Sequence, residues 1–421
     1  MSANKQRPDD QPELSDGGNS GRQFPADVVV PELSRRTFLG SSLGAMAVAS
    51  LPWAGAAIPT PWQWALRGRP GPGVTYGIGA VAVQDTKVSM ASRPFVFVRG
   101  DDSHLWILWE NPAGIWEWVD QGGKVDRPVG VIALDDDPNG NRPYAFVVRD
   151  RHLWMRWWNG ITWIWSDQGQ PASVDVLNGL GAVTAQLKPT LDPAPFAVVT
   201  GSDGNVWVNW QNVSSWNWYN MGSPGVAIGS SMGVLAVPDE RTGEQRLQVY
   251  VWDGGRQLWL GVTDMVSTRW TALGGPRSAI SGSAGATIII GASEWPPQPC
   301  CFVLSASTGD LWACQDGIWL NMGAPPSDHN AKIGLGAKRV LDMNNGSLNA
   351  LVFVTDGNNS VWACRWDGTT TPVWEDHGNP TGQTIDAGIG IAITQTSPAA
   401  AWLPHAFMRT TDGLVCENWQ Q

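Results

Sequence analysis

Tryptophan followed by a polar residue recurs along this sequence. The pairs Trp109-Glu110, Trp158-Asn159 and Trp366-Asp367 show it, and tryptophan makes up 27 of the 421 residues. An indole face stacks on the apolar C–H face of a sugar, while amide, carboxylate or guanidinium groups satisfy the sugar hydroxyls. These residue types favour a site for a polar, neutral ligand such as a glycan.

The candidate binding residues follow a recurring pair, an apolar residue and then tryptophan. Trp109, Trp157 and Trp210 come three residues after the tryptophan of such a pair, so the two-residue period of a strand points them to the opposite face. For each of them, packing between neighbouring sheets is the alternative interpretation. The predicted sugar-binding set is Trp109, Glu110, Arg156, Trp157, Trp158, Asn159, Asn209, Trp210, Arg365, Trp366 and Asp367.

Patterns for catalysis or metal binding are missing from the sequence. A glycosidase needs two carboxylates at one pocket, but the acidic residues fall mostly in predicted turns such as 135–137. His104 and His152 occupy the same place in adjacent repeats and are predicted to be turn residues. No sialidase-type box, P-loop, dinucleotide fingerprint or G-x-S-x-G motif occurs. We therefore expect no catalytic residue, no metal and no cofactor.

Charge and cysteine content narrow the partners further. The net charge is −11 and no Lys/Arg cluster follows residue 40, which argues against nucleic acid. The five cysteines have no zinc-ligand spacing. Cys301 and Cys314 lie on the two arms of a predicted hairpin and could form a disulfide, but buried free thiols are the preferred interpretation.

A pattern of tryptophan and glycine repeats along the chain with a period of about 50 residues. In six of its seven copies a proline follows two residues after the glycine, which is typical of a strand that ends in a turn. The seven copies of Trp-x-x-x-Gly are Trp64-Gly68, Trp118-Gly122, Trp165-Gly169, Trp218-Gly222, Trp270-Gly274, Trp319-Gly323 and Trp374-Gly378.

The apolar-Trp pair repeats with the same period. It begins at Leu105, Leu153, Val206, Leu258, Leu311 and Val361, and Leu414-Val415 is predicted as a degenerate seventh copy. A β-rich run and an Asp/Gly turn precede each copy, which indicates a hairpin. A Gly/Ala-rich strand, such as 77–80, stands further upstream.

Each repeat therefore holds four strands, and the sequence predicts an all-β fold, a seven-bladed β-propeller with four-stranded blades. The seventh repeat ends at Gln421 without its Trp-x-x-x-Gly strand, whereas 62–68 has that strand and nothing before it. The N-terminal strand is predicted to complete the last blade and close the ring. A β-sandwich would not repeat one tryptophan pattern seven times.

The segment 34–57 resembles a bacterial twin-arginine signal peptide. It contains Ser34-Arg35-Arg36-Thr37-Phe38-Leu39, then a weakly apolar run and the small residues 54–57. The run is too short to span a bilayer. The predicted organisation is a disordered n-region at 1–33, the signal at 34–57 and the propeller at 58–421. The resemblance implies export to the periplasm or beyond, with no membrane insertion after removal of the signal.

Repeats such as 145–165 resemble those of the bacterial seven-bladed lectins typified by the Photorhabdus fucose-binding lectin. The resemblance covers 60–421 and is weakest at 259–270 and 312–319, where the Trp-Trp-Asn-Gly element is missing. It implies several shallow sites between neighbouring blades that bind fucose or O-methylated sugars. The family's binding residues do not map onto this chain one by one.

The expected function is that of an exported, multivalent lectin whose partners are glycans or glycoconjugates and which can form a homo-oligomer. Two alternatives remain open: a non-catalytic scaffold for protein contacts, and a polysaccharide-acting hydrolase or lyase. A quinone dehydrogenase is suggested only by 307–312. Glycan binding separates the lectin from the scaffold, and release of reducing sugar identifies the enzyme.

Overall fold

The computed structural model describes most of the propeller region of the chain. The described residues are 62–85, 91–137, 140–212, 215–239, 241–253, 257–276, 279–290, 297–326, 330–341, 347–368, 371–397 and 400–420. All of them belong to the compact unit Pro59–Gln421. The predicted n-region at 1–33 and the predicted signal at 34–57 lie outside the described residues.

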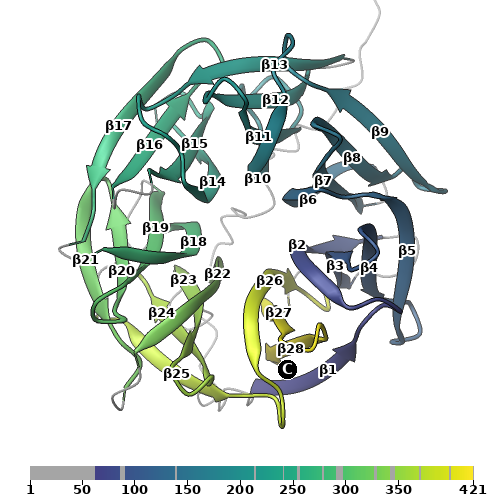
Figure 1. Ribbon diagram of the computed structural model, residues 1–421, viewed down its shortest axis with the longest axis vertical. Helices are drawn as coiled ribbons and strands as arrows, with labels where there is room; N and C mark the ends of the chain where they lie inside the picture. Colours follow the sequence, from purple (N-terminus) through teal and green to yellow (C-terminus); the bar gives the residue numbers. More distant parts are fainter. Residues whose placement is uncertain are drawn as a thin grey trace, which may run out of the picture. The chain divides into compact units, whose positions relative to one another are not determined.

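Within these ranges the chain forms β-strands and no helix, in seven four-stranded antiparallel sheets (Figure 1). Each sheet is one blade. Blade 1 contains β2 (Val74–Gln84), β3 (Ser92–Gly100), β4 (His104–Glu110) and β5 (Trp116–Lys124). Blade 2 contains β6 (Arg127–Asp137), β7 (Gly140–Arg149), β8 (His152–Trp158) and β9 (Trp163–Gly169). Blade 3 contains β10 (Val176–Ala185), β11 (Ala194–Gly201), β12 (Val206–Asn212) and β13 (Ser215–Gly222).

The other blades repeat this order. Blade 4 contains β14 (Ser230–Pro238), β15 (Gln245–Trp252), β16 (Leu258–Thr263) and β17 (Thr268–Gly274). Blade 5 contains β18 (Ile280–Ile289), β19 (Gln298–Ser305), β20 (Leu311–Gln315) and β21 (Ile318–Gly323). Blade 6 contains β22 (Ala331–Leu341), β23 (Leu348–Asp356), β24 (Val361–Trp366) and β25 (Val373–Gly378). Blade 7 contains β26 (Ile385–Thr394), β27 (Leu403–Thr410), β28 (Val415–Gln420) and β1 (Trp62–Gly68).

The blades form a closed ring around their first strands. The strand β2 contacts β6, and the same contact repeats from blade to blade until β26 meets β2 again. In Figure 1 these strands surround the centre and the fourth strands form the rim. The predicted seven-bladed propeller is confirmed. No helix long and apolar enough to cross a membrane occurs among the residues that the structure describes.

Ring closure follows the predicted route. The strand β1, purple in Figure 1, pairs antiparallel with the yellow β28, with Trp62 opposite Gln420 and Gly68 opposite Val415. The N-terminal strand is thus the outer strand of blade 7. Because both ends of the chain share one sheet, they hold the first and last blades together.

The Trp-x-x-x-Gly repeat has a physical reason that is the same in all seven blades. Each indole N–H donates to the backbone carbonyl just before the glycine of the preceding blade, as Trp165 does to Gln121, at 2.7 to 3.2 Å across the set. Each glycine has φ between +57° and +75°, which L side chains rarely adopt. The motif therefore joins every blade to its neighbour.

The hydrophobic core lies in the gaps between blades rather than at one centre. Phe97 and Ile107 of blade 1, for example, share a cluster with Ala145 and Val147 of blade 2. All five cysteines are buried there as free thiols, as preferred from the sequence, although Cys301 stands directly opposite Cys314.

One repeat assignment needs correction by a single residue. In blade 7 the pairing of β27 with β28 places Val415-Cys416, not Leu414-Val415, at the position of the apolar-Trp pair. The sequence has no tryptophan there to mark the register. The correction places Trp419 at the position that Trp109 occupies in blade 1.

Candidate functional site

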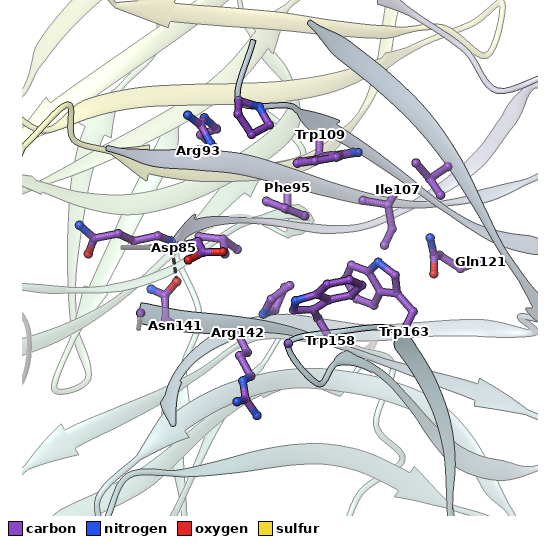
Figure 2. A pocket seen from close by; sticks show the side chains of 17 residues that line it. Asp85, Arg93, Phe95, Ile107, Trp109, Gln121, Asn141, Arg142, Trp158 and Trp163 are labelled. Atoms are coloured by element: carbon purple, nitrogen blue, oxygen red, sulfur yellow. Dashed lines mark hydrogen bonds between the residues drawn. The ribbon is translucent and has the colours of Figure 1, made fainter. Parts of the chain in front are cut away.

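An enclosed cavity lies in the gap between blades 1 and 2, with a volume of about 380 Å³. Trp109 of blade 1 and Trp158 and Trp163 of blade 2 line it. Figure 2 shows Trp158 and Trp163 on one side, facing Trp109, Phe95 and Ile107 on the other. Three indoles from two blades thus surround one space.

Local sequence fixes these rings. Trp109 on β4 packs on Phe95 of β3, with ring centroids 5.4 Å apart. Trp158 and Trp163 are directly opposite across the hairpin of β8 and β9, with centroids 5.8 Å apart. Asn159 holds the turn between them, because its Oδ1 accepts hydrogen bonds from the backbone N–H groups of Ile161 and Thr162.

A polar edge lies along one side of the cavity. Asp85, Arg93 and Asn141 line it there, and the Asn141 Oδ1 accepts a 2.8 Å hydrogen bond from the backbone N–H of Gln84. Gly140 allows the two blades to meet, since a Cβ at its φ of +136° would stand 1.9 Å from the Gln84 carbonyl oxygen. The polar groups are therefore positioned by the close contact between the backbones of the two blades at Gln84 and Gly140.

Gln121 at the end of β5 also lines the cavity, and Arg156 holds it. The Nε and Nη2 of Arg156 donate to Gln121 Oε1 at 3.2 and 3.1 Å, while the guanidinium lies over Trp165, 5.3 Å from the ring centroid. Burial lowers the pKa of Arg156. Arg156, predicted from the sequence to bind sugar, thus supports a residue of the cavity wall.

The cavity suits binding better than hydrolysis. Its apolar walls and few polar groups are typical of a small-ligand site. Asp85 is the one carboxylate among the described residues that line it, whereas glycoside hydrolysis by the usual routes needs a pair. The arrangement can stack a ring-shaped polar ligand and donate and accept hydrogen bonds at its edge.

The other predicted tryptophans lie in other gaps. Trp157 stacks on Tyr144 at 5.6 Å and 4°, and Trp210 stacks on Phe196 at 5.7 Å and 2°. Each occupies in its own blade the position of Trp109. Of the predicted set, the structure brings Trp109 and Trp158 to one cavity. It does not bring Trp157 or Trp210 there.

Two further predicted residues, Trp366 and Asn209, are held by protein contacts. Trp366 is 3% exposed and meets Phe302 edge-on, so no face of its ring is open to a ligand. Asn209 is fully buried, and its Nδ2 donates to the carbonyl of Asn217 at 3.4 Å. Trp366 therefore fits the packing alternative. Glu110 and Asp367 are half-buried at the ends of their hairpins.

Arg365 belongs to a polar cluster in the gap between blades 6 and 7. Its Nε lies 3.3 Å from Glu375 Oε1, and Trp62 Nε1 donates to Glu375 Oε2 at 3.3 Å. The buried His377 stacks on Trp62 at 4.2 Å and meets Asn418 at 2.6 Å. Although burial alone would raise it, His377 and Arg365 lower the pKa of Glu375 to about 2.

A second, more open hollow of about 630 Å³ lies between blades 4 and 5. Its rim carries Asp239, Arg241 and Asp316 and has no tryptophan among the described residues that line it. Pro238 of blade 4 occupies the position of Gln84 in blade 1, and Pro297 of blade 5 occupies the position of Asn141 in blade 2. In blades 1 and 2 this pair of positions is linked by a hydrogen bond from the Gln84 N–H. Because proline has no N–H, the corresponding link cannot form there.

His104 and His152 are not turn residues as predicted but the first residues of β4 and β8, directly after the turns. His104 Nδ1 lies 3.1 Å from Asp120 and 3.7 Å from Asp102, and His152 Nδ1 lies 3.0 Å from Asp167. The group of Asp102, His104 and Asp120 has two exposed carboxylates and a half-buried imidazole. It lies at the start of β4, the opposite end of that strand from Trp109.

Sequence reasoning missed Trp163, Phe95, Arg93, Asp85 and Asn141 as cavity residues. Trp163 had a usable signal, since it precedes the Trp-x-x-x-Gly tryptophan Trp165 by two residues and so shares its face. The others had none. Their proximity depends on how one blade lies against the next.

The fold and this gap define a class: a seven-bladed β-propeller with an aromatic cavity between adjacent blades. No family model matches the chain, and no curated protein matches it. Among solved structures the chain is similar to the fungal lectin of Aleuria aurantia, described as a six-bladed propeller with a fucose recognition mode. The two share 15% sequence identity, and the match covers 74% of this chain and 99% of that one with a TM-score of 0.48.

Two further solved structures are similar. The protein AofleA from Arthrobotrys oligospora shares 13% identity over 76% of this chain and 91% of its own, with a TM-score of 0.49. The SapL1 lectin, solved with α-methyl fucoside, shares 12% identity over 73% of this chain and 98% of its own, with a TM-score of 0.42.

Proposed function

We propose that this protein is a non-catalytic lectin and that the cavity between blades 1 and 2 is a glycan site. One observation carries the proposal. Trp109, Trp158 and Trp163 face one space from two blades, beside Asp85 and Arg93. Rings that only packed the blades together would leave no cavity between them.

We propose a sugar that carries a methyl group, such as a fucose-like or O-methylated sugar. Phe95, Ile107 and Pro143 form an apolar wall that accepts a methyl group, and Arg93, Asp85 and Asn141 offer donors and acceptors to ring hydroxyls. Several gaps with tryptophan at the Trp109 position would make one disc multivalent and raise avidity.

We further propose that the chain is exported by the segment 34–57 and acts outside the cytoplasm. Expression of the full chain in a bacterium, with and without Arg35→Lys/Arg36→Lys, tests this. Appearance of a shortened chain in the periplasm, lost in the double variant, is expected. Equal distribution of both chains would contradict it.

The binding test starts with a glycan array and continues by calorimetry on the strongest ligand. Trp109→Ala and Trp158→Ala should each weaken binding on the order of thirtyfold, since truncation of a central aromatic contact costs about 2 kcal/mol. Trp157→Ala is the matched control, because Trp157 stacks on Tyr144 outside this cavity. It should leave the affinity of this site unchanged, and a fall in the number of bound ligands would report a separate site in the gap between blades 2 and 3.

Three outcomes distinguish the candidates. Binding to none of the glycans on the array favours the protein-binding scaffold. Release of reducing sugar from a polysaccharide favours an enzyme. If Trp109→Ala or Trp158→Ala unfolds the propeller, which thermal melting reports, then these rings are packing residues and the assigned site is wrong.

A further inference from the structure

The gap between blades 7 and 1 repeats the frame of the cavity between blades 1 and 2. Trp419 corresponds to Trp109, since Trp419 pairs with His405 as Trp109 pairs with Phe95. Trp116 in the same way corresponds to Trp163, because both open the fourth strand of their blade. The two gaps therefore share their pair of facing tryptophans.

A guanidinium occupies this second gap. Arg67 stands just before Gly68, as Gln121 stands before Gly122, and its Cζ lies 4.2 Å from the ring centroid of Trp116 and 5.3 Å from that of Trp419. A cation over indole faces is attracted by the ring quadrupole, and more so where water is excluded. The chain's own side chain thus lies between the two rings.

Glu417 completes the surroundings of that guanidinium. Arg67 Nε donates to Glu417 Oε2 at 2.6 Å, and Nη2 contacts the same oxygen. The Glu417 side chain is fully buried. A buried carboxylate without its cation is strongly destabilising, because nothing replaces the water that it has lost. Arg67 and Glu417 therefore depend on each other.

The same carboxylate extends the network across the whole blade. His405 Nδ1 lies 2.6 Å from Glu417 Oε1, and His405 Nε2 lies 2.8 Å from Thr394 Oγ1. Because an ionised carboxylate only accepts, His405 must carry its proton on Nδ1. The network joins all four strands of blade 7, since its members Arg67, Glu417, His405 and Thr394 come from β1, β28, β27 and β26.

This network belongs to blade 7 alone among the seven blades. The position of Glu417, opposite the central residue of the second strand, is apolar in every other blade. The residues there are Ile107, Met155, Val208, Leu260, Ala313 and Ala363. Blade 7 is also the blade assembled from the two ends of the chain.

We infer that the gap between blades 7 and 1 is a guanidinium site that the chain fills with its own Arg67, and that this occupancy fixes β1 in blade 7. The other blades need no such site because a short turn supplies each fourth strand. The strand β1 does not follow β28 through a short turn, and it is held by strand pairing, by the hydrogen bonds of Trp62 and Trp64 to blade 6, by packing and by this ion pair.

The test removes the Arg67 guanidinium by substitution and then adds a guanidinium compound in solution. Arg67→Ala should lower the melting temperature, and β1 amides should exchange hydrogen faster than those of β3. Methylguanidinium chloride should recover part of the loss, whereas sodium chloride at the same concentration should not. Arg69→Ala is the matched control, since Arg69 is exposed and, among the described residues, donates to the Asp412 carbonyl. It should melt like the parent.

A second variant keeps the inference testable if Arg67→Ala fails to fold. Arg67→Gln/His405→Phe/Glu417→Ile copies the residues of blade 1, Gln121, Phe95 and Ile107. It should fold cooperatively and show no response to methylguanidinium. Any one of three results would overturn the inference. Arg67→Ala could melt at the parent temperature, or methylguanidinium chloride could restore its melting temperature no better than sodium chloride does. The third result is a triple variant as unstable as Arg67→Ala.

Discussion

The gap between blades 1 and 2 and the gaps on either side of blade 5 have the same backbone frame and different contents. In the first, the position three residues after the apolar-Trp pair is Trp109, and a cavity lies beside it. In blades 4 and 5 the same position is Val262 and Gln315. Four of the five cysteines fill the core of those two gaps: Cys300, Cys301, Cys314 and Cys364.

We call the hydrogen bonds and glycines that join the blades the frame, and the side chains that fill each gap its contents. The difference between the gaps shows that the contents can vary while the frame stays the same. The seven indole hydrogen bonds and left-handed glycines hold every blade to the next, whatever lies deeper in the gap. The side chains inside a gap can therefore differ from blade to blade while these links stay the same. The gap between blades 1 and 2 has aromatic rings around an enclosed cavity, whereas the cores of the gaps beside blade 5 also contain thiols, and the hollow between blades 4 and 5 has no tryptophan among the described residues that line it.

The largest expected effect comes from damage to the frame. Trp165→Ala removes the indole that donates to the Gln121 carbonyl at 2.9 Å and packs against Trp154. It should cost about 3–5 kcal/mol of unfolding free energy, measured with urea. Trp109→Ala should cost clearly less, since that ring borders a cavity. Equal losses would mean that frame and contents are not separable.

A smaller, pH-dependent effect is expected in the gap between blades 6 and 7. The pKa of Glu375 is about 2, below its ordinary value of 4.5, so its charge stabilises the fold above pH 4.5. That contribution is lost as the pH falls towards 2. Glu375→Gln should flatten the dependence of melting temperature on pH in this window. An unchanged slope would show that the contacts of Glu375 with His377 and Arg365 contribute nothing to the pH dependence.

The smallest effect concerns the thiols and should leave stability untouched. Burial raises the pKa of Cys314 to about 11 and that of Cys364 and Cys416 to about 12, and thiolates are the reactive form. The native protein should react very slowly with a thiol reagent at neutral pH and show five thiols on unfolding. Three thiols would indicate that Cys301 and Cys314 pair by oxidation.

Blade number, strand order and closure could be derived from the sequence because each blade repeats its own signals. Trp64 at one end and the missing final strand at the other were enough to predict the pairing of β1 with β28. The error at Leu414 has a simple origin. The tryptophan that marks the register in the other blades is replaced by Cys416, so the hairpin pairing alone locates it.

The site was less predictable for a different reason. Trp109 and Trp158 were chosen by their place within a blade, which the sequence records. That they line one cavity with Asp85 and Asn141 depends on the contact between blades, which no local pattern encodes. Trp366 shows the converse: it resembles Trp158 in the sequence, yet the neighbouring blade covers it.

Closure by β1 also has a consequence for synthesis on the ribosome. Trp62 emerges early, but its partner Gln420 follows more than 350 residues later. At ~5–20 residues per second, the wait lasts roughly 20 to 70 seconds. During that time Trp62, Trp64 and Arg67 have no sheet to join, so the nascent chain displays an unpaired strand until β28 has been synthesised. Chaperone binding to the nascent chain should concentrate there.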